Sequence, residues 1–210
     1  MSNGSTRHRA LLLLGPTASG KTPLGKLIEE RGLWDFRWVH FDFGAQMRRI
    51  AAGESLGESF GREEVELIGR LLETGGLLEN EHFPLAERIL RSFLAERVAN
   101  QDTCVVLNGL PGHVDQAKAI EAIVEIRTVI SLRCTRETVL QRVFSNAGGD
   151  RVERFDDNPE LVVAKLETFH ERTTPMVQHY RSLDVPVRQI VVTVAMTADE
   201  IWRILQRRGC

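Results

Sequence analysis

Residues 10–22 read ALLLLGPTASGKT and join a short apolar run to a glycine-rich loop. The run ALLLL (10–14) predicts a strand buried in a core. The octapeptide GPTASGKT (15–22) fits the pattern G-x-x-x-x-G-K-[ST], whose glycines permit the turns that aim several backbone N–H groups at a phosphate. Pro23 follows in the expected first turn of a helix, where its missing N–H costs little. This order of strand, loop and helix predicts a site for nucleotide phosphates.

Two side chains of this loop suit phosphate chemistry directly. Lys21 can reach β- and γ-phosphate oxygens, and Thr22 can ligate Mg²⁺. The helix that follows directs its N-terminus at the same anion. We therefore predict a nucleoside triphosphate with Mg²⁺ here, and Thr22 as the metal ligand. The predicted phosphate-binding residues are Gly15, Ala18, Ser19, Gly20, Lys21 and Thr22.

Short apolar runs alternate with longer amphipathic stretches along the rest of the chain. This alternation predicts one α/β domain over 1–210, built on a five-stranded parallel sheet with helices on both faces. The nine-residue polar start (1–9) is expected to be a disordered tail. The predicted strands are 10–14, 37–41, 103–107, 126–132 and 185–192, and the predicted helices are 21–31, 44–52, 62–74, 81–99, 113–124, 136–146, 159–181 and 197–208.

Two segments do not fit this alternation. Residues 42–99 hold about three predicted helices with no strand between them, and residues 146–158 form a polar loop with two adjacent glycines. We interpret the first as a helical insertion and the second as a short lid, because charged, glycine-containing loops beside a phosphate site are candidates for closure.

Composition excludes some partners. The net charge is −2 and hydrophobic residues make up 42% of the chain, so we expect neither nucleic acid nor a membrane as a partner. The three cysteines have no metal-binding spacing, which favours free thiols in the cytoplasm, and we expect a monomer. All basic residues but four are arginines. Two explanations of this arginine excess stay open. One is codon bias, and the other is a need for guanidinium groups, which bind phosphates bidentately.

Three segments beyond the loop resemble the acceptor site of the adenylate kinases and related nucleoside monophosphate kinases. DFGAQMRR (42–49) resembles S-T-G-D-L-L-R, ETGGLLEN (73–80) resembles a short G-x-L-V turn, and LNGLPGHVDQAKAI (107–120) resembles D-G-F-P-R-x-x-x-Q-A. The resemblance implies that Arg48 holds the acceptor phosphate and that the amide of Gln116 reads an acceptor adenine. The acceptor-binding residues that it implies are Gly44, Arg48, Gly75, Leu77, Gly109 and Gln116.

A fourth segment, RFDDNPELVVAKLETFHERTTPMVQHY (154–180), is similar to that family's G-R-x-D-D-N-x-E and the helix after it. The resemblance implies that Arg154 closes over the transferred phosphoryl group, that Lys165 also acts on it, and that Arg142 stacks on the base of ATP. Together the segments extend the resemblance over residues 10–208, with a sheet order like 2-3-1-4-5. The octapeptide alone is also similar to tRNA prenyltransferases, but this chain lacks room for their inserted domain.

The sequence departs from the family at several acceptor positions. Gly112 stands where the family has an arginine, Asn108 where it has an acid that supports Mg²⁺, and Ala45 where it has another acid. Lys165 replaces an arginine, and Arg49 or Arg151 could substitute for a lost guanidinium. The resemblance therefore implies ATP- and Mg²⁺-dependent phosphoryl transfer to a nucleoside monophosphate, with AMP the first choice. A kinase for a different small acceptor and a weakly active nucleotide-binding protein remain as alternatives.

Overall fold

A five-stranded parallel sheet forms the centre of the molecule. The computed structural model describes residues 7–57, 59–98, 100, 102–145 and 159–207. Its strands lie in the order β2-β3-β1-β4-β5, which confirms the predicted α/β class and strand order. The bounds are β1 (His8–Leu14), β2 (Arg37–Asp42), β3 (Thr103–Asn108), β4 (Val124–Arg133) and β5 (Val187–Val191).

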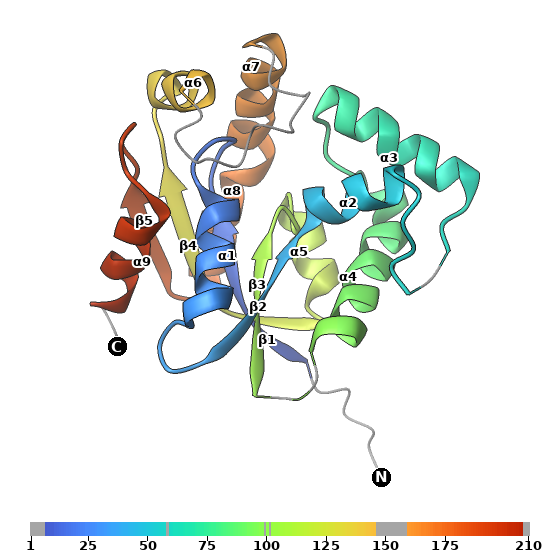
Figure 1. Cartoon of the computed structure of the whole chain (residues 1–210), viewed down its shortest axis with the longest axis horizontal. Coiled ribbons are helices and arrows are strands. Elements are labelled where there is room, and N and C mark those ends of the chain that lie inside the picture. The colour runs from blue at the N-terminus through green and yellow to red at the C-terminus, as the bar shows by residue number, and fades with distance from the viewer. Residues whose placement is uncertain (1–6, 58, 99, 101, 146–158, 208–210) are drawn as a thin grey trace.

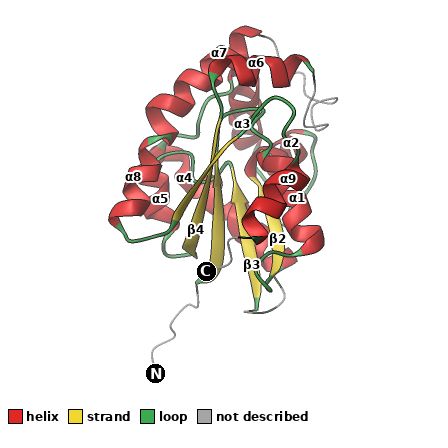
Figure 2. Ribbon diagram, turned by 90° about the vertical axis from the view of Figure 1, so that its left-hand side faces the viewer, coloured by secondary structure: helices red, strands yellow, loops and turns green. Residues whose placement is uncertain are grey.

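Helices cover both faces of this sheet (Figure 2). One face carries α4 (Phe83–Arg97), α5 (Val114–Ile120) and α8 (Pro175–Ser182), and the other carries α1 (Lys21–Arg31) and α9 (Ala198–Gln206). Alternate side chains of β1 serve the two cores, since Leu12 packs on the first side and Leu13 on the second. A strand buried on both faces explains the unbroken apolar run ALLLL.

The remaining elements lie beyond the carboxyl ends of the strands (Figure 1). They are α2 (Phe43–Ala51), α3 (Arg62–Thr74), the short 3₁₀ turn η1 (Asn80–His82), α6 (Arg136–Phe144), α7 (Pro159–Thr168) and the π-helical turn η2 (Phe169–Thr173). Ligands of open parallel sheets bind at this edge. The fold therefore brings the predicted phosphate loop and the helical insertion to the same end of the sheet.

The insertion is less separate from the core than the sequence suggested. Its last helix, α4, buries six side chains, and the ring of Phe93 lies 5.1 Å from that of Phe41 on β2. Helix α3, in contrast, has Ile68 as its single buried residue. Within 42–99, α4 is thus a core helix, and α3 is the part that projects from the sheet.

Three differences between the predicted and observed elements have a clear physical reason. Strand β1 begins at His8, inside the expected tail, because the backbone N–H of His8 donates to Ile123 and the strand pairs with β4 from that point. Helix α5 ends at Ile120, since the chain must turn before β4 begins at Val124. The single helix predicted over 159–181 is interrupted by η2, where the N–H of Thr174 bonds five residues back to Phe169.

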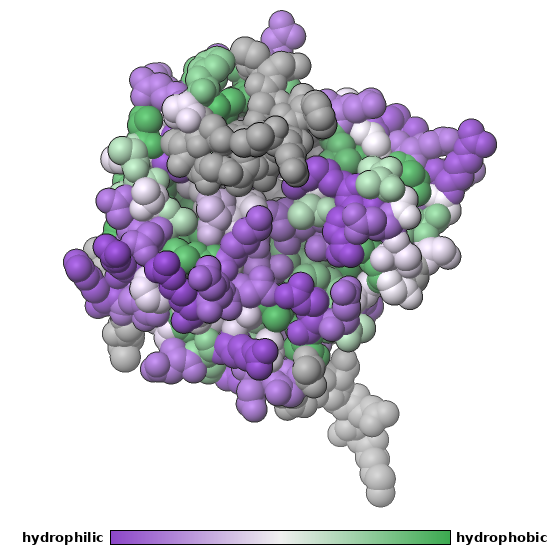
Figure 3. Space-filling model, viewed as in Figure 1, coloured by the Kyte–Doolittle hydropathy of each residue, from purple (hydrophilic) through white to green (hydrophobic). Residues whose placement is uncertain are grey.

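The surface is mostly polar on the face that Figure 3 shows. Its hydrophobic atoms lie in small separate groups. Within the ranges that the structure describes, no helix has the length and apolar character to cross a membrane.

Candidate active site

One cleft at the carboxyl edge of the sheet brings most of the predicted site residues together. Its walls come from five segments, within residues 13–22, 42–48, 71–78, 108–116 and 165–173. The phosphate loop forms one end, and the segments with the acceptor motifs form the other. The predicted residues that line it are Gly15, Ala18, Ser19, Gly20, Lys21, Thr22, Gly44, Arg48, Gly75, Leu77, Gly109, Gln116 and Lys165.

The phosphate loop has the backbone shape that its sequence predicts. Gly20 has a φ of 93°, which favours glycine, and Ala18 also lies in the left-handed region, with a φ of 57°. A Cβ on Gly15 would lie 2.6 Å from the Ser19 hydroxyl and 3.0 Å from the carbonyl oxygen of Leu132. No side chain caps α1 at Gly20, so its first N–H groups are available to an anion.

Two polar side chains of the loop are placed where an anion could bind. The ammonium group of Lys21 donates to the carbonyl oxygens of Gly15 and Pro16, at 2.6 and 2.8 Å, so it spans the mouth of the loop. The hydroxyl of Ser19 is fully buried and has no hydrogen-bond partner within the described part of the chain. A buried hydroxyl without a partner is costly, and a bound phosphate would supply one.

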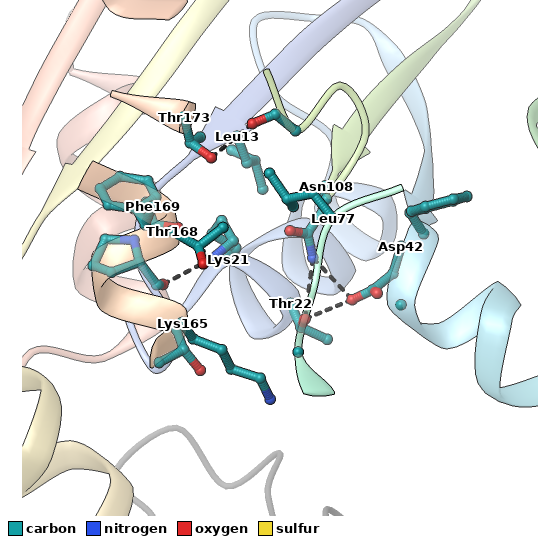
Figure 4. A pocket seen from close by; sticks show the side chains of 18 of the residues that line it. Leu13, Lys21, Thr22, Asp42, Leu77, Asn108, Lys165, Thr168, Phe169 and Thr173 are labelled. Carbon is teal, nitrogen blue, oxygen red and sulfur yellow. Dashed lines mark hydrogen bonds between the residues drawn. The ribbon is translucent and has the colours of Figure 1, made fainter. Parts of the chain in front are cut away.

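Thr22 hydrogen-bonds to two polar residues at the ends of neighbouring strands (Figure 4). Its hydroxyl donates to Asp42 Oδ2 at 2.6 Å, and Asn108 Nδ2 donates to the same carboxylate oxygen at 2.8 Å. Burial raises the pKa of Asp42, but the hydrogen bonds from Thr22 and from the Ala45 N–H, with His40 and Arg48 nearby, lower it by more. Asp42 is therefore an anion at neutral pH.

Asp42 is the functional candidate that the sequence reasoning missed. It lay inside the quoted motif DFGAQMRR, but the comparison with the family drew attention to Ala45, where the family has its acid. The available signal was positional, because Asp42 ends a predicted strand beside the strand that ends at Asn108. Polar residues at the carboxyl ends of adjacent parallel strands meet at one edge of the sheet.

The acceptor end of the cleft holds two basic side chains. Arg48 extends from α2 over Gly44, where a Cβ would lie 3.4 Å from its guanidinium. Lys165 extends from α7 over Gly75, where a Cβ would lie 2.5 Å from the lysine Cε. Gly75 also ends α3 with a φ of 66°. Both glycines thus leave room for a cation that lines the cleft.

The amide of Gln116 is engaged with the protein itself. Its Nε2 donates to the carbonyl oxygen of Leu78 at 2.7 Å, and its Oε1 accepts from the Gly112 N–H at 2.8 Å. Each end of an amide can form one further hydrogen bond. Recognition of a base by Gln116 therefore stays a prediction, and it would have to use those second positions.

The turn η2 closes the cleft opposite Asp42, as Figure 4 shows for Phe169 and Thr173. The hydroxyl of Thr173 donates to the carbonyl oxygen of Gly112 at 2.7 Å. Arg172 makes a two-pronged ion pair with Glu79, with both distances 3.0 Å. Widened π turns occur frequently at functional sites, and this one joins two of the acceptor segments to α7.

Comparison with known proteins finds kinases of nucleoside monophosphates as relatives. The chain is 28% identical to an adenylate kinase of Caulobacter sp. (strain K31), over 81% of this chain and 84% of that protein. It is 24% identical to an adenylate kinase of Haloarcula marismortui, over 93% and 94%. It is 26% identical to a uridylate kinase of Saccharomyces cerevisiae, over 93% and 87%. The chain is thus similar to nucleoside monophosphate kinases over most of its length. No family model matches it.

These similarities confirm the resemblance drawn from the motifs and the phosphotransferase class that it implied. They also make the departures concrete. At position 112 the kinase motif has an arginine, and here a Cβ on Gly112 would lie 3.0 Å from Leu77 and 3.4 Å from Gln116. A larger side chain would have to displace one of these neighbours. At Gly112 a Cβ would require the Leu77 side chain to shift by a few tenths of an ångström.

Arg142 does not line the cleft. Arg142 is 2% exposed and donates to the carbonyl oxygens of Ala18, Thr193, Val194 and Met196. It connects the phosphate loop to the turn before α9, so stacking on a donor base stays a prediction that requires it to leave these carbonyls.

Arg49 pairs with Glu54 at 2.7 Å and does not line the cleft, so it does not replace the guanidinium missing at 112. The predicted lid (146–158), with Arg151 and Arg154, lies outside the described residues.

Proposed function

We propose that this protein transfers the γ-phosphoryl group of ATP to a nucleoside monophosphate, with AMP as the first candidate acceptor. The observation that carries the proposal is the continuity of the cleft, since the phosphate loop and all three acceptor segments line the same cavity. Direct transfer needs donor and acceptor in line within one water-excluding site. The proposal is supported by the names of the relatives, which include adenylate and uridylate kinases.

Different side chains of the cleft bind the donor and the acceptor phosphates. The loop and Lys21 bind the β- and γ-phosphates of ATP, and Arg48 binds the acceptor phosphate from the other end. Lys165 adds positive charge as the phosphoryl group moves between them. No general base is needed, because the attacking phosphate oxygen is already anionic. Catalysis of this kind is positioning together with electrostatic stabilisation.

Mg²⁺ fits the oxygen ligands at the loop. Thr22 presents a hard oxygen atom, the kind of ligand that Mg²⁺ prefers, and the Asp42 carboxylate beside it adds negative charge. When bound, the ion neutralises charge on the transferring phosphoryl group.

Turnover tests the proposal directly. ADP formation from ATP and Mg²⁺ would be measured against a panel of nucleoside monophosphates, with Lys21→Ala as the blank. We expect turnover with at least one monophosphate and none in the variant. If ATP binds and no monophosphate is phosphorylated, the proposal is wrong.

One observation favours a second candidate, a kinase for a small acceptor with less negative charge. The glycine at 112 leaves Arg48 and Lys165 as the basic side chains of the acceptor end among the described residues. A hydroxyl acceptor would need fewer cations than a phosphate. This candidate predicts ATP turnover with an alcohol acceptor and none with any monophosphate.

A further inference from the structure

The acid near the phosphate loop lies on a different strand from the one that the family motif predicts. The motif places it at the end of β3, where this chain has Asn108. In the parallel pairing of β2 with β3, Asp42 stands directly opposite Asn108. The carboxylate has thus moved one strand across the sheet while staying in the same row of the register.

This carboxylate is held firmly toward Thr22. One oxygen accepts from the Thr22 hydroxyl and from Asn108, and the other accepts from the Ala45 N–H at 2.9 Å. Asp42 is 8% exposed and Asn108 is 4% exposed. Three donors fix the orientation of a side chain that lines the nucleotide cleft. Asp42 and Asn108 are hydrogen-bonded to each other, and both are hydrogen-bonded to Thr22 of the loop.

The hydrogen-bond pattern suits a metal at Thr22. Because the hydroxyl proton points at Asp42, an oxygen lone pair of Thr22 can be directed elsewhere. Mg²⁺ in such sites is bound through one or two protein oxygens, substrate phosphates and waters. No cluster of three or more metal-ligating side chains exists within the described ranges, which fits an ion held mainly by the nucleotide.

We propose that Asp42, rather than residue 108, is the acid that positions Mg²⁺ on the bound nucleotide, and that Asn108 orients the Asp42 carboxylate. The inference rests on the proposed function only in taking Mg²⁺-ATP as the donor. Asp42 acts through Thr22 and the waters of the ion, and it is therefore a positioning residue. Ala45, at the position of the family's other acid, contributes its backbone N–H, which donates to Asp42.

The test is the dependence of ATP binding on Mg²⁺. Calorimetry would give the ATP dissociation constant with a chelator and with Mg²⁺. The readout is the ratio of the first constant to the second, which is large when Mg²⁺ strengthens ATP binding. Asp42→Asn is expected to reduce that ratio by about 10- to 100-fold, the usual cost of losing a partner behind a metal ligand. The exchange Asp42→Asn with Asn108→Asp restores one carboxylate and one amide to the pair, and most of the ratio should return.

Asp35→Asn is the matched control, because Asp35 is exposed in the turn before β2 and should leave the ratio unchanged. Thermal denaturation would check that each variant folds. If Asp42→Asn does not fold, Asn108→Ala carries the test, since it removes the donor that orients the Asp42 carboxylate and should lower the ratio.

A ratio that neither variant changes overturns the proposal. So does a loss of turnover in Asp42→Asn with an unchanged ratio, which would give the carboxylate another role. Because ATP binding is the readout, a failure to phosphorylate monophosphates leaves this result readable and counts only against the proposed function.

Discussion

The two ends of the cleft are built by different means. The phosphate end is made largely of backbone, with N–H groups and glycine turns that a short local motif encodes. The acceptor end is made of side chains from α2, α7 and the segments at 75–78 and 108–116. The first keeps every residue of its motif, whereas the second lacks the arginine at 112. A site made of backbone is thus easier to recognise than one in which each side chain can be replaced.

The largest effect should come from the acceptor cation. Arg48→Ala should lower kcat/KM for the monophosphate by roughly a hundredfold to a thousandfold, because a charge-stabilising donor is lost in a closed site. The affinity for ATP should change little. Steady-state kinetics with each substrate varied in turn would measure both values.

Arg49→Ala is the control for Arg48→Ala. Arg49 is the next residue on α2, but it pairs with Glu54 outside the cleft. Equal losses in the two variants would contradict the division between the ends of the cleft. A large loss of ATP affinity in Arg48→Ala would contradict it also.

A smaller effect should come from the core below the phosphate end. His40 lies against Gly25 on α1, where a Cβ would be 2.2 Å from the imidazole, and its Nε2 has no partner in the described structure. Burial lowers the pKa of His40 from 6.5 to about 4, with Asp42 raising it and Lys26 lowering it by less. The unfolded chain therefore takes up a proton between these values that the folded chain does not.

Stability should consequently fall as the pH drops from about 6.5 to about 4. The contribution of His40 is fully present above its unfolded pKa, and its loss is worth up to about 3 kcal/mol. Denaturant unfolding at several pH values would measure it. His40→Gln should flatten this dependence, while His82→Gln, at an exposed site, should not. An unchanged slope in His40→Gln would show that His40 is not the group responsible.

The smallest effect should come from replacing a glycine at the acceptor end. A second glycine outside the cleft separates backbone strain from crowding of Lys165. Gly75 and Gly53 both have a positive φ, 66° and 83°, so alanine at either should cost about 1 kcal/mol of stability. Only at Gly75 would the new Cβ meet Lys165, since nothing lies within 4 Å of Gly53. Gly75→Ala should therefore also raise KM for the acceptor, and Gly53→Ala should not. Equal kinetics in the two variants would show that Lys165 does not act there.

Much of the fold could be predicted because its signals are local. Buried strands appear as apolar runs such as ALLLL, and the bounds of α1 and α3 agree with the predicted helices. The break at η2 could not be predicted, because residues 159–181 keep a helical pattern while Thr173 bonds to Gly112, far away in the sequence. The start of β1 was missed for a similar reason, since it depends on pairing with β4.

The site was predictable to the level of which residues meet, but not of what they contact. The motifs placed Gln116 and Lys165 in one cleft, as the structure has them. They could not show that the Gln116 amide bonds to Leu78 and Gly112, or that Arg142 is buried among carbonyls. Asp42 escaped notice because its importance comes from β2 lying beside β3, which is a property of the sheet.

In the proposed function, donor and acceptor bind together in one cleft. The affinity of a double-ended inhibitor, in which adenosine is joined through five phosphates to a second adenosine or to uridine, tests it most directly. We expect at least one of these compounds to bind more than about tenfold tighter than ATP, because linking the two ligands removes the entropic cost of binding the second. Binding of both compounds no tighter than ATP would contradict it.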